Sequence, residues 1–217
     1  RRQRQMWIRD SADMSCTTKA TVYNVNGAKM TAGVYTIQNG KVTTDYLRSG
    51  VTYYLKEIKA PVGYNLSTEV IPIVADASEK TVEYTKEISD EKYGNNPILG
   101  KVAIQKYYSD GETGLLEPEA NTTFQVYLKS KGSYEACTDY ERAIIKTDSN
   151  GYAVTGNLYY GTYVVHQVDS GDVDAIHVDD FDVEVTENGK VYTYPLNNKL
   201  FKAYLKILKK DKQTEKQ

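Results

Sequence analysis

The chain has 217 residues and a mass of 24.5 kDa, which suits one large domain or two of ordinary size. Its 27 Lys and Arg residues nearly balance 29 Asp and Glu residues, so no basic excess favours nucleic acid as a partner. Hydrophobic residues make up 40 %, enough for folded cores, but no apolar run reaches the ~18–20 residues of a membrane helix. Two Cys and two His leave little for a metal site or a histidine-based catalytic triad.

In the first half of the chain, apolar and polar residues alternate, as is typical of half-buried strands. Asn26-Gly27 and Asn39-Gly40 are typical of hairpin turns between such strands. The 20 Tyr residues favour strands as well, because tyrosine combines an apolar ring with a polar tip. The expected strands are residues 18–24, 51–58, 70–74 and 81–88.

The second half continues this pattern, with Asn150-Gly151 and Asn188-Gly189 separating the later strands. The best helix candidate is the segment 136–145. Many short strands with turn signals between them predict an all-β fold of antiparallel, Greek-key sandwiches. The expected strands are residues 101–108, 123–128, 152–154, 162–168, 180–186 and 190–196.

The two halves repeat each other. Residues 50–58 align with 161–168, and residues 204–214 echo the opening of the second half. Two complete units and one opening strand are typical of a window cut from a tandem array, and the absence of an initiator Met favours an internal piece. We therefore predict a first unit over 1–95, a second over 96–200, and the first strand of a third unit over 201–217.

The most specific string is YYLKEIKAPVGY at residues 53–64. It resembles the E-box of Cna-B-type domains, including SpaA-like pilin domains, in Gram-positive surface proteins. The resemblance implies tandem prealbumin-like (Ig-like) β-sandwiches that act as stalk modules without a cofactor. Many members carry a self-formed amide between a Lys on the first strand and an Asn or Asp on the last, promoted by the buried E-box Glu.

That reaction needs a neutral amine, a polarised carboxamide and a proton carrier, all held close together. In the second unit, strand alternation places Lys106 towards the core and favours Asn198 over Asn197 as the acceptor. Gln167 stands at the E-box position and cannot carry a proton, so Asp179 is the nearest substitute acid. The alternative is a snorkelling Lys106 and a capping Asn198 without a bond.

In the first unit the E-box acid is present, but the position of the lysine nucleophile is not occupied by a lysine. Glu57 supplies the E-box acid and Asp90 is the expected acceptor, but the nucleophile position is read as Arg9. Arginine does not deprotonate in proteins, so a salt bridge from Arg9 to Glu57 or Asp90 is expected instead. Lys19 is a weaker alternative nucleophile, and Lys209 is the equivalent position of the third repeat.

These observations predict a non-enzymatic stalk module of an extracellular, cell-wall-anchored adhesin or pilin-like protein. Its expected partners are neighbouring repeats of the same chain and a host extracellular-matrix protein. One alternative is a module that itself binds a host protein or glycan. The other is an accessory β-domain of a secreted carbohydrate-active enzyme.

Overall fold

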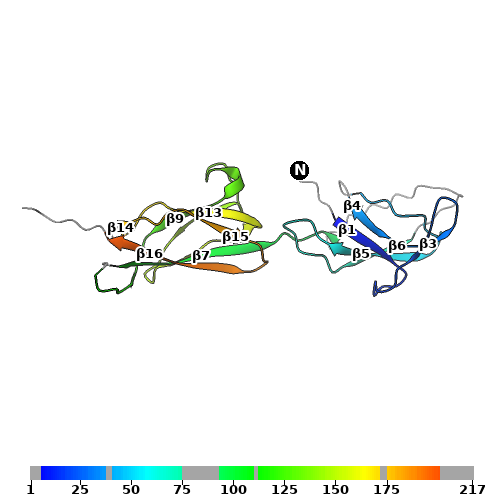
Figure 1. The fold of residues 1–217 in the computed structure, drawn as a ribbon, viewed down its shortest axis with the longest axis horizontal. Coiled ribbons are helices and arrows are strands. Elements are labelled where there is room, and N and C mark those ends of the chain that lie inside the picture. The colour runs from blue at the N-terminus through cyan, green and yellow to red at the C-terminus, as the bar shows by residue number, and fades with distance from the viewer. Residues whose placement is uncertain (1–5, 38–40, 75–92, 110–111, 172–174, 201–217) are drawn as a thin grey trace, which may run out of the picture. The chain divides into compact units, whose positions relative to one another are not determined.

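The computed structural model describes residues 6–37, 41–74, 93–109, 112–171 and 175–200. The chain divides into two compact units, Arg1–Leu99 with Thr186–Gly189, and Gly100–Val185 with Lys190–Gln217. Figure 1 shows that both are built from strands, which confirms the predicted all-β fold. The expected strand at 81–88 and the start of a third repeat at 201–217 lie outside the described residues.

The first unit contains a four-stranded antiparallel sheet in the order β4-β1-β5-β6 and a separate β2-β3 hairpin. The E-box strand β5 is central, and its side chains alternate between buried and partly exposed positions. Tyr53, Leu55 and Glu57 share the buried face, as the sequence pattern predicts. The strands are β1 (Met6–Ser11), β2 (Thr21–Tyr23), β3 (Lys29–Thr31), β4 (Val34–Ile37), β5 (Thr52–Lys59) and β6 (Val70–Val74).

The second unit has two sheets. One has the order β10-β9-β13-β15, and the other is built around the long strands β7 and β16, with β11 and β14 outside them. Strands β8 and β12 also pair with β7. The first strands are β7 (Leu99–Ser109), β8 (Glu117–Pro118), β9 (Thr123–Leu128), β10 (Arg142–Lys146) and β11 (Tyr152–Val154). They are followed by β12 (Leu158–Tyr159), β13 (Gly161–Gln167), β14 (Ala175–Ile176), β15 (Phe181–Val185) and β16 (Val191–Leu200).

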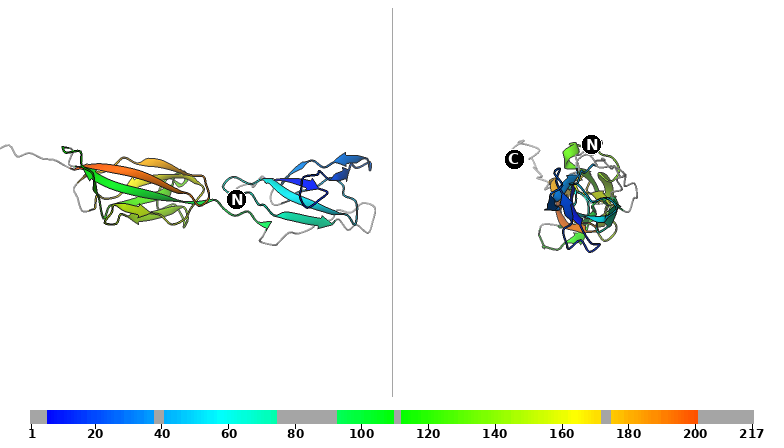
Figure 2. Two further views of the ribbon diagram at one scale, coloured as in Figure 1. Left: turned by 90° about the horizontal axis from the view of Figure 1, so that it is seen from below. Right: turned by 90° about the vertical axis from the view of Figure 1, so that its right-hand side faces the viewer.

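Strands β7 and β16 are the first and last of the second unit, and they pair in parallel over nine residues from Val191↔Lys101 to Lys199↔Ser109. The green β7 and the orange β16 lie side by side in the left view of Figure 2. This is the exception to the expected antiparallel pairing. It brings the two ends of the unit into one sheet.

The core of the second unit lies between its two sheets. It is formed by buried apolar residues that occupy every second position of the long strands, such as Val102 and Ile104 on β7 and Val183 and Val185 on β15. Burying these side chains supplies the main driving force for the unit.

The predicted helix at 136–145 is wrong. Residues Arg142–Lys146 form strand β10, and the described residues before it are turns after a short 3₁₀ segment, η2 (Lys129–Lys131). The β-branched Ile144 and Ile145 favour a strand, and their exposure alternates as an edge strand requires: Ile144 is exposed and Ile145 is buried.

Candidate functional site

A hairpin places an acidic residue next to Lys106. Strand β8 folds back antiparallel to β7, with Tyr107 opposite Pro118 and Tyr108 opposite Glu117. One step further, the backbone N–H of Glu119 donates to the carbonyl oxygen of Lys106 at 3.0 Å. Opposite residues of an antiparallel pair point to the same face, and the side chains of Lys106 and Glu119 both point into the core.

Lys106 and Glu119 form an ion pair without solvent contact. The Nζ of Lys106 lies 2.7 Å from Oε2 of Glu119, and both side chains are 0 % exposed. The same Nζ donates to the carbonyl oxygen of Tyr107 at 2.7 Å. Burial lowers the pKa of Lys106 below its ordinary value, and the hydrogen bond and charge of Glu119 oppose this effect. Burial therefore favours the neutral amine that a nucleophile requires.

Asn198 completes a cluster of three. It lies on β16, the neighbour of β7, and is 1 % exposed, whereas the alternative Asn197 is exposed. Its Nδ2 lies 3.5 Å from Oε1 of Glu119, and its Oδ1 has no hydrogen-bond partner among the described residues. A buried amide oxygen without a partner costs free energy unless the site uses it.

The segment that carries Glu119 is fixed by its neighbours. The hydroxyl of Thr147 donates to the backbone oxygen of Glu119 at 2.7 Å. Gly151 has a φ of 72°, and a Cβ there would lie 2.2 Å from the backbone oxygen of Lys106. Only glycine tolerates both the positive φ and this close approach, so the turn after β10 packs directly on the pair.

Amine, acid and amide are the three groups that amide exchange needs. A carboxyl group between an amine and a carboxamide can take a proton from the first and give it to the second. Desolvation strengthens each electrostatic contact within the cluster. The arrangement can therefore support attack of the Lys106 amine on the Asn198 carboxamide.

The sequence analysis missed Glu119 and placed the acid elsewhere. Gln167 is buried, but its Nε2 donates to the carbonyl oxygen of Asp169 at 2.9 Å and its Oε1 accepts from the N–H of Val178 at 3.1 Å. Asp179 is exposed. Among the described contacts neither residue reaches the amine, and the acid beside Lys106 is Glu119.

In the first unit, Glu57 is 6 % exposed and also lies beside an amide. Its Oε2 accepts from Nδ2 of Asn95 and from the backbone N–H of Ser67, both at 2.7 Å. Its Oε1 has no hydrogen-bond partner in the described part of the chain. The acceptor predicted from the sequence, Asp90, lies outside the described residues, as does Lys209.

The predicted salt bridge of Arg9 stays a prediction, and the structure gives the backbone register of its strand. Strand β1 pairs directly with the E-box strand, with Ile8 opposite Glu57 and Arg9 opposite Lys56, after an irregularity between Trp7 and Ile8. The alternative nucleophile, Lys19, is exposed.

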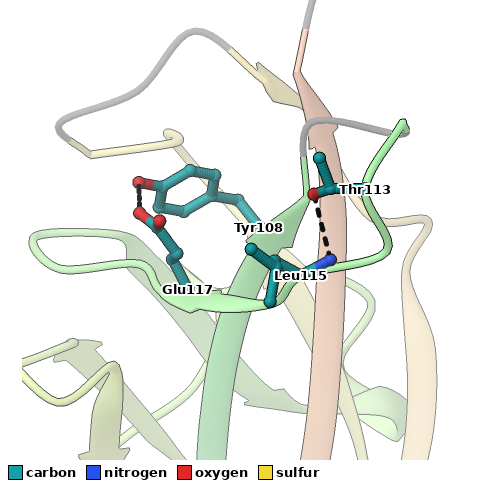
Figure 3. A pocket seen from close by; sticks show the side chains of 4 residues that line it. All are labelled: Tyr108, Thr113, Leu115 and Glu117. Carbon is teal, nitrogen blue, oxygen red and sulfur yellow. Dashed lines mark hydrogen bonds between the residues drawn. The ribbon is translucent and has the colours of Figure 1, made fainter.

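A surface hollow lies at the turn between β7 and β8, lined by Tyr108, Thr113, Leu115 and Glu117 (Figure 3). The Tyr108 hydroxyl donates to Oε2 of Glu117 at 2.5 Å, and this carboxylate raises the pKa of Tyr108. Leu115 is 67 % exposed, so this hollow is open to solvent and separate from the buried cluster.

The described residues were searched for a metal site and for a membrane-spanning helix. They contain no group of three or more His, Cys, Asp or Glu side chains placed to hold a metal ion. They also contain no helix long and apolar enough to cross a membrane.

Comparison with known proteins supports the fold. Residues 17–91 match the family model of the SpaA prealbumin-like fold domain, which confirms the resemblance of the E-box region. The structure is similar to that of the Bacillus anthracis TIE protein, with a TM-score of 0.59 and 23 % identity over 91 % of this chain. The chain spans 31 % of that protein's chain. A search of curated proteins found no match.

Two pilus proteins also match at lower scores. GBS52, the minor pilin of Streptococcus agalactiae, matches with a TM-score of 0.41 and 19 % identity, over 95 % of this chain and 87 % of that chain. The C-terminal fragment of the pilus adhesin SpaC from Lactobacillus rhamnosus GG matches with a TM-score of 0.49 and 12 % identity, over 94 % and 92 %.

Proposed function

We propose that this chain, with its SpaA-type prealbumin-like domain at residues 17–91 and a second β-sandwich after it, is a stalk segment of a Gram-positive cell-surface adhesin or pilin-like protein. In this proposal the second unit is cross-linked by an amide between Lys106 and Asn198, with Glu119 as the catalytic acid and base. The first unit carries no such bond.

The buried cluster is the observation that carries the proposal. An amine, a carboxyl group and a carboxamide gather in the core, with Lys106 at 2.7 Å and Asn198 at 3.5 Å from Glu119. Burying an ion pair rarely increases stability over apolar residues of similar size. A chemical role explains why the core of a small sandwich contains all three groups.

The proposed reaction exchanges one amide for another. Lys106 transfers a proton to Glu119, and its neutral Nζ attacks Cγ of Asn198. Glu119 then returns a proton to Nδ2, the Cγ–Nδ2 bond breaks, and ammonia leaves. The attacking nitrogen also loses its second proton, which leaves with the ammonia as ammonium. Glu119 therefore ends as the carboxylate it was at the start, and the net change is a new Nζ–Cγ amide and one released ammonium ion.

The position of the bond suits a tether. Lys106 lies on the first strand of the second unit and Asn198 on its last, and these strands pair side by side. Tension along a stalk enters through the ends of each unit. A covalent link between the first and last strands carries this load across the unit without unfolding what lies between them.

Intact-mass measurement tests the proposal, because each Lys–Asn amide removes one ammonia, about 17 Da. We expect this deficit in the wild-type chain and its absence in Lys106→Ala, Glu119→Ala and Asn198→Ala. Lys101→Ala, on the same strand but outside the cluster, is the matched control and should keep the deficit. A wild-type chain of full mass would overturn the proposed bond.

A further inference from the structure

A threonine hydroxyl contacts the proposed catalytic acid. Thr122 is 0 % exposed, and its Oγ1 donates to Oε1 of Glu119 at 3.0 Å. Its backbone is fixed on both sides by Thr147, because the N–H of Thr122 donates to the Thr147 hydroxyl at 2.9 Å and its carbonyl oxygen accepts from the Thr147 N–H at 3.0 Å. The donor therefore comes from a fixed position.

The two oxygens of Glu119 have different partners. Oε2 faces the amine of Lys106, whereas Oε1 faces both the Thr122 hydroxyl and Nδ2 of Asn198. A carboxyl group can rotate about its terminal bond. A donor on Oε1 holds this oxygen at the amide and keeps Oε2 facing the amine, where it can take up the proton of Lys106.

We propose that Thr122 is a positioning residue for amide formation, acting through Glu119. This inference rests on the proposed function, since it assigns a role within the same reaction. Hydrogen bonds to charged groups are the stronger ones in proteins, and small errors of placement slow reactions between held groups. Loss of the Thr122 hydroxyl should therefore change the rate of bond formation.

Thr155 provides a matched control. It is a second buried threonine of the same unit, and its hydroxyl accepts from the N–H of Val102 at 3.0 Å and donates to the carbonyl oxygen of Gly156 at 2.7 Å. Its described hydrogen bonds are with Val102 and Gly156 and not with the Lys106 cluster. Thr155→Val replaces a buried hydroxyl by a methyl group of similar size. It therefore measures how much the loss of any buried threonine hydroxyl in this unit slows bond formation.

The test follows the mass of the full-length chain with time. Each variant is made by cell-free synthesis, translation is stopped, and the fraction that has lost about 17 Da is measured at intervals. We expect Thr122→Val to form the bond roughly tenfold more slowly or worse, Thr122→Ser to restore the rate, and Thr155→Val to match the wild type. Circular dichroism checks that each variant is folded.

The outcomes separate the two proposals. A wild-type chain that never loses mass overturns the bond and, with it, the role of Thr122. A wild-type chain that loses mass, with Thr122→Val at the same rate, overturns the positioning role alone. Equal slowing in Thr122→Val and Thr155→Val, or failure of Thr122→Ser to restore the rate, also overturns it, because the effect would then be structural.

Discussion

The two units place an acid beside an asparagine in different ways. In the first unit the acid is Glu57, on the E-box strand, and its partner is Asn95. In the second unit the E-box position holds Gln167, and the acid is Glu119 on the opening hairpin, beside Asn198. The acid–asparagine contact recurs while the strand that supplies the acid changes.

The units also differ in the amine. The described contacts of Glu57 are with Asn95 and the backbone of Ser67, whereas Glu119 holds a lysine. Asn95 Nδ2 also donates to the backbone oxygen of Asn65, so hydrogen bonds tie the exit segment of the first unit to the loop after the E-box. An E-box therefore identifies the fold, and a buried lysine beside the acid identifies the unit in which a bond is proposed.

The two largest losses of stability should come from removing either end of the proposed bond, and removal of the acceptor measures the bond itself. The proposed bond closes a loop of 198 − 106 = 92 residue steps. In the loop-entropy model a cross-link of this length stabilises by roughly 4–5 kcal/mol. We expect Asn198→Ala to lose that amount in denaturant unfolding, with the exposed Asn197→Ala as a control that loses almost nothing.

Lys106→Ala should cost more than Asn198→Ala. It removes the same bond and also leaves Glu119 buried without its partner, which typically costs ~3–5 kcal/mol more. If the two variants unfold at the same denaturant concentration, the ion pair contributes little. If Asn198→Ala has the same free energy of unfolding as the wild type, then no bond stabilises the second unit.

In the first unit, Glu57→Ala should have a smaller effect and leave the mass unchanged. It removes two hydrogen bonds to a carboxylate, which we expect to cost about 2–3 kcal/mol in total, since the Ser67 N–H is only partly buried. Hydrogen exchange of residues 93–98 should rise, because the exit segment loses its contact. Glu69→Ala, an exposed acid of the same unit, is the control. An unchanged exchange rate would show that the contact does not hold the segment.

The pH dependence of bond formation should reflect a coupled pair. The reactive state of Lys106 and Glu119 contains one proton fewer than the fully protonated pair and one more than the fully deprotonated pair. The rate should therefore fall at both pH extremes. Burial lowers the pKa of Lys106, so the alkaline fall should begin below the ordinary lysine value of 10.5. A rate that rises through this pH would contradict the role of the shared proton.

Much of this arrangement could be predicted from alternation along strands. The pattern places Lys106 and Asn198 on inward faces, and both are buried. Glu119 was missed because the acid was sought at the E-box position. The place of Glu119 opposite Lys106 depends on the register of the β7–β8 pairing across a loop, which alternation along the strands does not fix. The register of Arg9 could not be predicted, because it depends on an irregularity in β1 that the sequence does not mark.

The smallest effect should come from giving the second unit the E-box acid of the first. Gln167→Glu keeps an oxygen for the N–H of Val178 but replaces the donor that now contacts the carbonyl oxygen of Asp169. Losing one such hydrogen bond should cost about 1 kcal/mol. The rate of mass loss should stay at the wild-type value, because in the proposed reaction Glu119, which contacts the amine, is the acid.

The decisive version of this experiment combines Gln167→Glu with Glu119→Gln, which exchanges the two side-chain types within the second unit. We expect the double variant to keep its full mass, because an acid at residue 167 accepts from the N–H of Val178 and does not contact Lys106. The single variant Glu119→Gln is the matched control. If the double variant loses about 17 Da while the single variant does not, then the E-box position can serve Lys106, and the contrast between the two units lies only in which acid is present.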